Sequence, residues 1–360
     1  MQWFPILGPL ILIVLLEPHS TIAATCTISS YNEDDITNAT KECSDITLNS
    51  ISIPAGVTLK LNLKQGAKLT FQGTLTWGYQ EWDGPLLNIT GTDVEITGMP
   101  DHVLDPKGGL WWDGKAEVGG KTKPVSFVFN KLRNAVIHSV TIKNTPFHAI
   151  WIEDSDGVVV QDVLVNNTEG RTLGKGTDGI NVWRSNNVTI QRFTVYNQDD
   201  CVAIKSGTNI LIEDSYCSGG HGLSIGSVGG RDYNIVENVT VSNSQILNSA
   251  NGVRIKTVYN ATGAVTNVTY KDIVLTDINS YGIIAHGNYN GPSGSSPTGG
   301  VSITHFVLQN VTGTVKDTGT NIFIQVNNAS DWLWTGVNVT GGGRIRQCEG
   351  IPDDSGISCN

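Results

Sequence analysis

The sequence has 360 residues, a charged fraction of 16% and a formal net charge of −10. An acidic chain of this kind argues against a nucleic-acid partner and provides no long-range attraction for an anionic polymer. No Pro/Ser-rich linker, charge run or shift in composition divides the sequence. We therefore expect a single domain, and we expect the protein to act as a monomer.

Residues 1–24 predict a secretory signal peptide. An apolar run from Ile6 to Leu16 is followed by the small residues Ala23 and Ala24. The run is too short to span a bilayer, which takes about 20 apolar residues. A buried N-terminal strand is the alternative interpretation. We therefore expect a secreted, extracellular protein with no membrane span, whose mature domain occupies residues 25–360.

The mature sequence predicts one helix and many short strands. Residues Asn32 to Cys43 show a helical pattern, with Ser29 or Ser30 as the N-cap. Between residues 130 and 340, polar residues, often Asn, repeatedly precede short β-branched runs. A repeat of about 20 to 30 residues without intervening helices predicts an all-β parallel β-helix rather than a sandwich or barrel. The helix would cover the open end of the first coil.

Ten asparagines lie in N-glycosylation sequons: Asn38, Asn88, Asn166, Asn187, Asn238, Asn260, Asn267, Asn310, Asn328 and Asn338. Asparagine is also favoured at β-helix turns, because it tolerates left-handed backbone angles and its amide can bond the neighbouring turn. We therefore expect only a minority of these asparagines to carry sugar.

Four polar blocks recur at the period of the strands. They are Gly176-Thr177-Asp178-Gly179, Gln198-Asp199-Asp200-Cys201, the glycine-rich block 220–231 with His221, and Arg254-Ile255-Lys256. Asp178 and Asp199 are 21 residues apart, and Asp199 and His221 are 22 apart. If each interval is one coil, these residues stack at about the 4.8 Å spacing of paired strands. Three carboxylates, an imidazole and two cations would then line one stripe of the surface.

These blocks resemble the signatures of the polygalacturonase family of pectin-degrading glycoside hydrolases. The family carries Asn-Thr-Asp-Gly, Gln-Asp-Asp-Cys, Gly-His-Gly-Leu-Ser-Ile-Gly-Ser and Arg-Ile-Lys, and the last three occur here unchanged. The resemblance implies a right-handed parallel β-helix that hydrolyses α-1,4-galacturonosyl linkages of homogalacturonan with inversion, without a cofactor or a metal. It also implies three disulfides between cysteines close in sequence: Cys26 with Cys43, Cys201 with Cys217, and Cys348 with Cys359.

Glycosidic cleavage takes an acid that protonates the leaving oxygen and a base that activates water. By the resemblance, Asp199 is the general acid, and Asp178 and Asp200 activate the water. Crowding of the carboxylates would keep Asp199 protonated at mildly acidic pH, and His221 would support that protonation. Carboxylates on adjacent coils would lie roughly 5 Å apart, a spacing more typical of retaining enzymes. We follow the family, which inverts, because two bases that share one water need not obey that rule.

Substrate recognition is expected from a local basic patch. Arg254 and Lys256 flank Ile255, so on a strand both side chains share one face. Arg and Lys match the carboxylate that every galacturonic acid carries. The resemblance implies that these two residues bind uronate at the cleavage point and that Tyr289 contacts the neighbouring sugar. Further candidates for the patch are Arg231, Lys205 and Arg184.

The sequence departs from the family around this constellation. Gly176 replaces the Asn of Asn-Thr-Asp-Gly, Asn181 replaces an Asp, and Lys205 stands where Asn is common. Residues 286–288 are His-Gly-Asn instead of Gln-Gln-Asp. The changes remove acid and amide groups and add cationic ones. We therefore expect altered subsites, with a changed preference for chain length, methyl-esterification or branching.

Three functions remain open on the sequence. An endo-acting polygalacturonase is favoured by a compact chain without large insertions that could block one end of a cleft. The alternatives are exo-cleavage or attack on a substituted pectin such as xylogalacturonan, and a catalytically weak pectin-binding protein or decoy. Plant polygalacturonase-inhibiting proteins are the expected protein partners. A pectate lyase is disfavoured, because it needs calcium-binding acids and an arginine base that these blocks do not provide.

Overall fold

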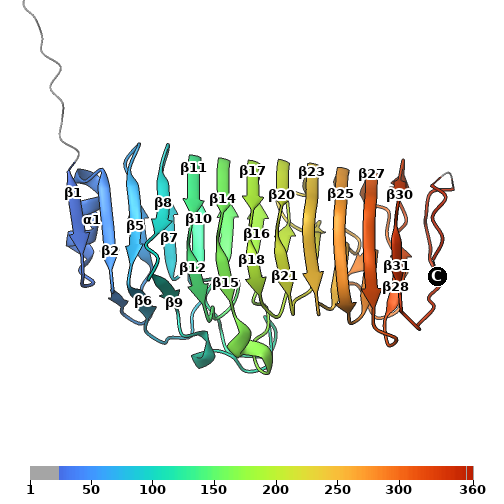
Figure 1. Ribbon diagram of the computed structural model, residues 1–360, viewed down its shortest axis with the longest axis horizontal. Helices are drawn as coiled ribbons and strands as arrows, with labels where there is room; N and C mark the ends of the chain where they lie inside the picture. Colours follow the sequence, from blue (N-terminus) through green and yellow to red (C-terminus); the bar gives the residue numbers. More distant parts are fainter. Residues whose placement is uncertain (1–23, 354, 360) are drawn as a thin grey trace, which may run out of the picture.

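The computed structural model describes residues 24–353 and 355–359. In this part the chain winds into a right-handed parallel β-helix, whose coils follow one another along the long axis of the molecule (Figure 1). The all-β class and the β-helix expected from the sequence are confirmed. The predicted signal peptide, residues 1–24, lies outside the described residues apart from Ala24. No helix within the described ranges is long and apolar enough to cross a membrane.

One wall of the coil is a sheet of ten parallel strands that follow the order of the chain. Its strands are β4 (Leu59–Asn62), β7 (Leu87–Thr90), β10 (Phe127–Asn130), β13 (Ile150–Glu153), β16 (Ile180–Trp183), β19 (Val202–Ile204), β22 (Leu223–Val228), β24 (Asn251–Val258), β26 (Tyr281–Tyr289) and β28 (Thr320–Gln325). Each strand bonds to the strand one coil before it and to the strand one coil after it, so the sheet runs the length of the helix.

The rest of the wall is a sheet of 21 strands, in which the long strand β23 pairs with both β20 and β21. Its strands are β1 (Thr25–Ile28), β2 (Asp45–Asn49), β3 (Ser52–Ile53), β5 (Lys68–Gln72), β6 (Thr74–Trp77), β8 (Glu95–Gly98), β9 (Val103–Asp105), β11 (Arg133–His138), β12 (Thr141–Lys143), β14 (Asp156–Gln161), β15 (Leu164–Asn166), β17 (Ser185–Gln191), β18 (Thr194–Tyr196), β20 (Gly207–Glu213), β21 (Tyr216–Ser218), β23 (Ile235–Leu247), β25 (Gly263–Ile278), β27 (Val301–Val315), β29 (Ala329–Ser330), β30 (Leu333–Thr335) and β31 (Asn338–Thr340). Two short 3₁₀ helices, η1 (Gly108–Leu110) and η2 (Thr168–Arg171), lie on loops below the strands in Figure 1.

The core follows from the register between coils, which stacks apolar residues on apolar residues. In the ten-stranded sheet Ile150 pairs with Ile180, Ile180 with Val202 and Val202 with Leu223, and all four are buried. Burying one such side chain stabilises the fold by about 1.5–3 kcal/mol relative to leaving it exposed. Successive residues of a strand point to opposite faces. The residues between these core positions therefore face outwards.

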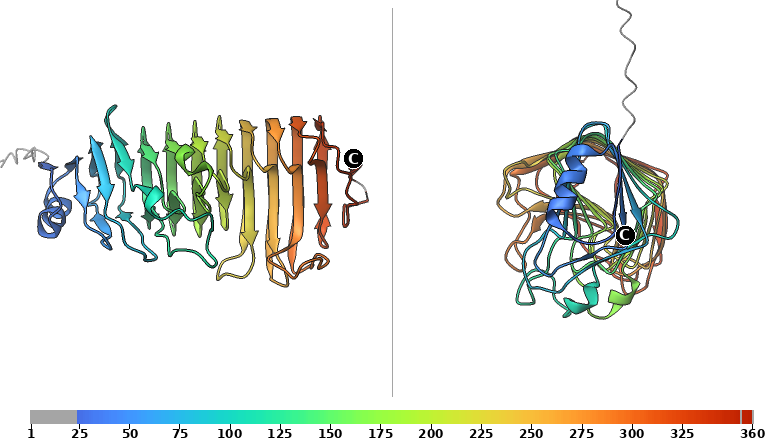
Figure 2. Two further views of the ribbon diagram at one scale, coloured as in Figure 1. Left: turned by 90° about the horizontal axis from the view of Figure 1, so that it is seen from below. Right: turned by 90° about the vertical axis from the view of Figure 1, so that its left-hand side faces the viewer.

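Helix α1 (Glu33–Glu42) lies across the N-terminal end of the coil (Figure 2). Its N-cap is Asn32, whose Oδ1 accepts hydrogen bonds from the backbone N–H groups two and three residues later (3.0 and 3.1 Å). The predicted helix is confirmed, but the prediction of Ser29 or Ser30 as its N-cap is wrong. Only a residue directly before the first turn can reach those donors.

Three disulfides join the cysteines in the pairs that the resemblance implied. Cys26–Cys43 connects β1 to the residue that follows α1, Cys201–Cys217 lies in the central coils, and Cys348–Cys359 holds the C-terminal segment. Each bridge closes a short loop and so fixes local structure. Two of the bridges do this at the ends of the coil, and Cys201–Cys217 does it beside β19.

A ladder of asparagine side chains runs along one bend of the coil. Each amide donates to the side-chain oxygen one coil earlier: Asn187 to Asp156 (2.7 Å), Asn209 to Asn187 (3.1 Å), Asn238 to Asn209 (3.2 Å) and Asn267 to Asn238 (2.7 Å). The four asparagines have φ between 53° and 57°, the left-handed region that Asn tolerates better than most residues. The sequon asparagines Asn187, Asn238 and Asn267 therefore have a structural role at a turn, and so does Asn310, which donates to Asp272 (2.7 Å).

We expect Asn238→Ala to lower the unfolding free energy by about 2 kcal/mol, because it removes two ladder hydrogen bonds and strains a left-handed backbone. Asn238→Gly is the matched control, since glycine adopts this φ freely and both variants lose the sequon equally. Thermal unfolding should rank wild type above Gly and Gly above Ala. Equal melting temperatures for the three proteins would contradict a stabilising ladder.

Candidate active site

The outer face of the ten-stranded sheet carries two rows of side chains. The first row contains Trp151, Asn181, Ala203, Ser224 and Arg254, each in register with the next. The second contains Trp183, Lys205, Lys256 and His286 on the same series of coils. Lys205 directly follows β19, where its backbone N–H donates to Val182. Of these residues, Lys205 and Lys256 line the cavity of the site.

The predicted catalytic residues lie in the turns that lead into three successive strands of this sheet. Asp178 precedes β16, Asp199 and Asp200 precede β19, and His221 precedes β22. The structure therefore brings all four onto neighbouring coils, as the spacing in the sequence indicated.

Asn197, which we did not identify from the sequence, holds two of these turns together. Its buried Nδ2 lies 2.9 Å from each of the carbonyl oxygens of Thr177, Asp199 and Asp200. The only signal in the sequence is its position directly before Gln-Asp-Asp. Because the amide contacts both coils, it fixes their relative position at the carboxylates.

Asp200 is the most heavily bonded carboxylate of the site. It is 1% exposed, and its Oδ1 accepts from the Ser224 hydroxyl (2.7 Å) and from Arg254 (3.3 Å). Its Oδ2 accepts from the ammonium of Lys256. Arg254 and Lys256 do share one face, as predicted, while Ile255 between them is buried. Both cations are engaged by Asp200 and so position this carboxylate, and Lys256 also lines the cavity.

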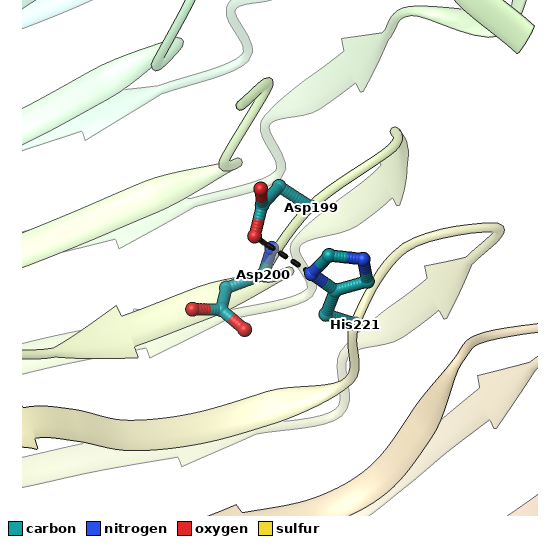
Figure 3. A group of neighbouring side chains, drawn as sticks. All are labelled: Asp199, Asp200 and His221. Atoms are coloured by element: carbon teal, nitrogen blue, oxygen red, sulfur yellow. Dashed lines mark hydrogen bonds and ion pairs between the residues drawn. The ribbon is translucent and has the colours of Figure 1, made fainter. Parts of the chain in front are cut away.

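Asp199 is bonded to His221 (Figure 3). The distance from Nδ1 of the imidazole to Oδ1 of Asp199 is 2.8 Å. Burial by itself would raise the pKa of Asp199, but the hydrogen bond and the charge of His221 hold this pKa well below its usual range. The expectation that crowding keeps Asp199 protonated is therefore wrong for the free protein, because the histidine outweighs the neighbouring carboxylates.

Asp178 is the carboxyl group with the highest proton affinity of the site. Burial raises its pKa well above the usual value, and Asp199 and Asp200 raise it further. The residue is 4% exposed, and the nearest basic side chain among the described residues is His148, with Nε2 3.8 Å from Oδ2. The surroundings thus raise the pKa of Asp178 and lower the pKa of Asp199.

His148 is a second residue that the sequence did not single out, since no motif surrounds it. Its Nδ1 accepts a hydrogen bond from the indole N–H of Trp151 (3.0 Å), and its ring lies 3.8 Å from that of Phe147. Burial, with the nearby charge of Lys205, lowers the pKa of His148 well below its usual value. An indole N–H can only donate, so the neutral ring carries its proton on Nε2, which faces Asp178.

A cavity of about 440 Å³ lies above these residues. Asp178, Asp199 and Asp200 line it together with Lys205, Arg231, Lys256 and Tyr289, and residues 115–118 form a further part of its lining. Asp199, Asp200 and His221 place ligand atoms within 4.8 Å of one another, a spacing that a metal ion could use. Because three donors already surround Asp200, the cluster is better suited to proton transfer.

The comparisons with known proteins agree with this geometry. The family model for glycosyl hydrolases family 28 matches residues 43–359. The chain belongs to this family. It is 48% identical to endopolygalacturonase I of Aspergillus aculeatus over 342 residues, which is 94% of this chain and 90% of that relative. It is 47% identical to endopolygalacturonase A of Aspergillus niger over 345 residues, with 94% and 92% covered.

Two solved structures share the fold. Endopolygalacturonase I from Stereum purpureum, complexed with two galacturonates, has a TM-score of 0.82 at 35% identity and covers 88% of this chain and 95% of that chain. An endo-xylogalacturonan hydrolase from Aspergillus tubingensis has a TM-score of 0.77 at 23% identity, with 94% and 99% covered. The protein is therefore a glycoside hydrolase of family 28, as the resemblance of its polar blocks implied.

The family 28 hydrolase uses only some of the predicted basic residues in its cavity. Lys205 and Arg231 line the cavity as expected, but Arg184 does not. Arg184 has a left-handed backbone (φ 49°), and its guanidinium binds Asp154 (2.6 Å) and Glu153 (2.9 Å). The guanidinium also stacks on Trp183. The prediction for Arg184 is therefore wrong, because two carboxylates outside the cavity already bind it.

Two departures from the family pattern have physical explanations. Gly176 has a φ of +66°, and a Cβ at this position would lie 2.1 Å from the ring of Phe147, so the aromatic ring leaves no room for Asn. His286 does not add a cation to the site. Burial, with Arg254 and Lys256, lowers its pKa to about 3, and it stays neutral at the pH values at which an unperturbed histidine titrates.

Asp113 organises the loop that borders the cavity of this hydrolase. Its carboxylate binds the buried ammonium of Lys123 (2.9 Å) and the backbone N–H groups of Lys121 (2.6 Å) and Lys115 (3.0 Å). Burial would raise the pKa of Asp113, but these donors lower it to about 2.

We expect Asp113→Asn to lower the melting temperature in a pH-dependent way. The folded pKa of about 2 lies below the unfolded value of about 3.9. The stabilisation is therefore complete above the unfolded pKa and is lost as the pH falls through the folded pKa. Melting curves of both proteins should differ most near pH 6 and converge towards about pH 2. A difference that stays constant with pH would show that the charge of Asp113 is irrelevant.

Proposed function

We propose that this protein is an endo-polygalacturonase, which hydrolyses α-1,4-galacturonosyl linkages of homogalacturonan with inversion. The observation that carries the proposal is the convergence of three carboxylates and Lys256 on one open cavity, with His221 bonded to Asp199 and Arg254 bonded to Asp200. Endopolygalacturonases that are 45–48% identical over most of this chain support the same reaction.

Asp199 is the general acid in this proposal, and His221 supplies its proton. The free protein holds Asp199 ionised, and a carboxylate can only accept, so Nδ1 of His221 donates to it. The imidazole is 37% exposed and can exchange protons with solvent. As the bond to the leaving oxygen breaks, the proton on Nδ1 of His221 moves to Asp199, and Asp199 passes a proton on to that oxygen, so Asp199 ends ionised as it began.

Asp178 and Asp200 activate the water that attacks the anomeric carbon. Asp200 is held in one orientation by Ser224, Arg254 and Lys256. The raised pKa of Asp178 gives it a high proton affinity, which suits a base that works in mildly acidic solution. The water loses one proton to this pair while the leaving sugar gains one from Asp199, so the charges balance. A base must be ionised, so activity is lost as the pH falls through the raised pKa.

Arg254, Lys256 and Tyr289 bind the galacturonate at the cleavage point. The ring of Tyr289 lies 5.8 Å from the guanidinium of Arg254 and 5.3 Å from the ammonium of Lys256. A sugar ring above the tyrosine would bring its carboxylate close to both cations. Each cation can bind Asp200 and a substrate oxygen at once, since guanidinium and ammonium groups have several N–H donors.

The proposal also covers where the enzyme acts and with what it interacts. We propose that residues 1–24 direct secretion, that residues 25–360 form the catalytic domain, and that the enzyme meets pectic polysaccharide outside the cell as a monomer. Plant polygalacturonase-inhibiting proteins are candidate partners. The complete set of acids and donors favours hydrolysis over a catalytically weak binding role.

The test is a time course on polygalacturonic acid that follows viscosity, product sizes and the anomer released first. We expect a rapid fall in viscosity, mixed oligomers and inverted products. The matched control is Asp199→Asn, which should lower kcat by at least about 10²-fold with little change in fold or KM. Release of monomer with slow thinning would support an exo enzyme instead. Activity retained by Asp199→Asn would refute the acid assignment.

Lys256→Asn should lower kcat as well as raise KM. The sequence alone suggested a pure binding role, but the ammonium also bonds the catalytic Asp200. Its loss removes a substrate contact and leaves a buried carboxylate short of one donor. Steady-state kinetics on polygalacturonic acid would separate the two effects, and a change in KM alone would exclude the proposed role in positioning Asp200.

A further inference from the structure

Lys205 differs from the other cations that line the cavity. The ammonium of Lys256 is bonded to Asp200, Arg231 donates to the carbonyl oxygen of Ser227 (2.8 Å), and the ammonium of Lys115 is bonded to the carbonyl of Gly119. The ammonium of Lys205 has no hydrogen-bond or ion-pair partner among the described residues, although the side chain is only 8% exposed and lines the cavity. This cation is therefore available to an anionic ligand that enters the cavity.

The surrounding aromatic residues hold the ammonium in place. It lies 5.6 Å from the centre of the Trp151 ring, within the range of a cation–π interaction. Trp151 is itself fixed by its hydrogen bond to His148 (3.0 Å) and by edge contact with Trp183 (6.0 Å between ring centres). A long side chain that is already ordered loses less entropy when it binds a ligand.

The residues near Lys205 leave its charge available. The neighbouring strand carries the neutral Asn181, whose buried amide has no hydrogen-bond partner in the part of the chain that the structure describes. Burial lowers the pKa of Lys205, while Asp178 raises it. Asp178, however, makes no ion pair with it within 4.0 Å in the described residues. A substrate carboxylate beside the ammonium would favour its charged form.

The position of Lys205 indicates which carboxylate it meets. It follows β19, whereas Lys256 belongs to β24, two coils further along the sheet. At about 4.8 Å per coil, their backbones are roughly 10 Å apart. The ammonium of Lys256 reaches back to Asp200 on the coil of Lys205 and is engaged there, whereas the ammonium of Lys205 remains available. A polymer of uronic acids that extends along the coils brings a second carboxylate towards Lys205.

We propose that Lys205 forms a second carboxylate-binding subsite, on the N-terminal side of the cleavage point, which takes the free acid of a neighbouring galacturonate. The inference rests on the proposed polygalacturonase activity. It adds to the selectivity of the enzyme for non-esterified galacturonan, because a methyl ester at this sugar removes the charge that the ammonium of Lys205 binds.

The test compares wild type with Lys205→Asn on polygalacturonic acid and on pectins of increasing random methyl-esterification. Loss of a charged contact should raise KM by about tenfold on polygalacturonic acid with kcat changed less than about threefold. If two free carboxylates are required, kcat/KM of wild type should fall roughly with the square of the free fraction. For Lys205→Asn, kcat/KM should fall roughly in proportion to the free fraction itself, because one of the two required carboxylate contacts is gone.

Two further variants keep the result interpretable. Lys205→Arg retains the charge and should restore most of the affinity, and Arg192→Gln removes one exposed cation that pairs with Asp162 outside the cavity. A thermal melting curve of each variant separates loss of the fold from loss of substrate binding. An unchanged KM in Lys205→Asn would overturn the inference about Lys205. A shifted pH profile without a change in KM would also overturn it, because the substitution would then act through Asp178. No cleavage by wild type would instead refute the proposed function.

Discussion

Backbone hydrogen bonds between successive coils are the constraint on which the site depends. They place each residue directly above its counterpart one coil earlier, so that about 22 residues of sequence become one strand spacing in space. Asp178, Asp199 and His221 therefore come together without any long-range folding of loops. The apolar stack inside the coil makes this register rigid, because a slip by one residue would turn every core side chain towards water. Carboxylates that repel one another are held together by the wall behind them.

The charges of the site are distributed unevenly, and this gives each carboxylate a different character. Asp200 receives two cations and a hydroxyl, Asp199 receives the imidazole of His221, and Asp178 receives no close charged partner among the described residues. The same three side chains in water would titrate within a narrow range. In the protein, burial raises the pKa of Asp178 while the histidine lowers that of Asp199. The separation provides both a proton acceptor and a route for proton delivery within one cavity.

Two departures from the family pattern, Gly176 and Lys205, are connected through a chain of aromatic residues beside the catalytic carboxylates. Gly176 makes room for Phe147, whose ring packs on His148. His148 accepts from Trp151, and that indole ring in turn faces the ammonium of Lys205. These contacts link the substitutions physically, so they act as one altered region of the cleft. The change at His286 is electrically silent, because burial lowers its pKa to about 3.

The sequence by itself determined the repeat, the fold class and the residues of the catalytic stripe. Asparagine turns and β-branched runs are local signals, and a constant coil length translates directly into stacking, so Asp178, Asp199, Asp200 and His221 could be placed together in advance. The sequence could not decide how their charges pair. Whether a histidine outweighs two carboxylates at Asp199, or whether Arg184 reaches the cavity, depends on side-chain direction, burial and competing partners. Asn197 and His148 have no motif and act only through contacts with other coils. Those properties arise from packing between segments far apart in the chain, and only the tertiary structure decided them.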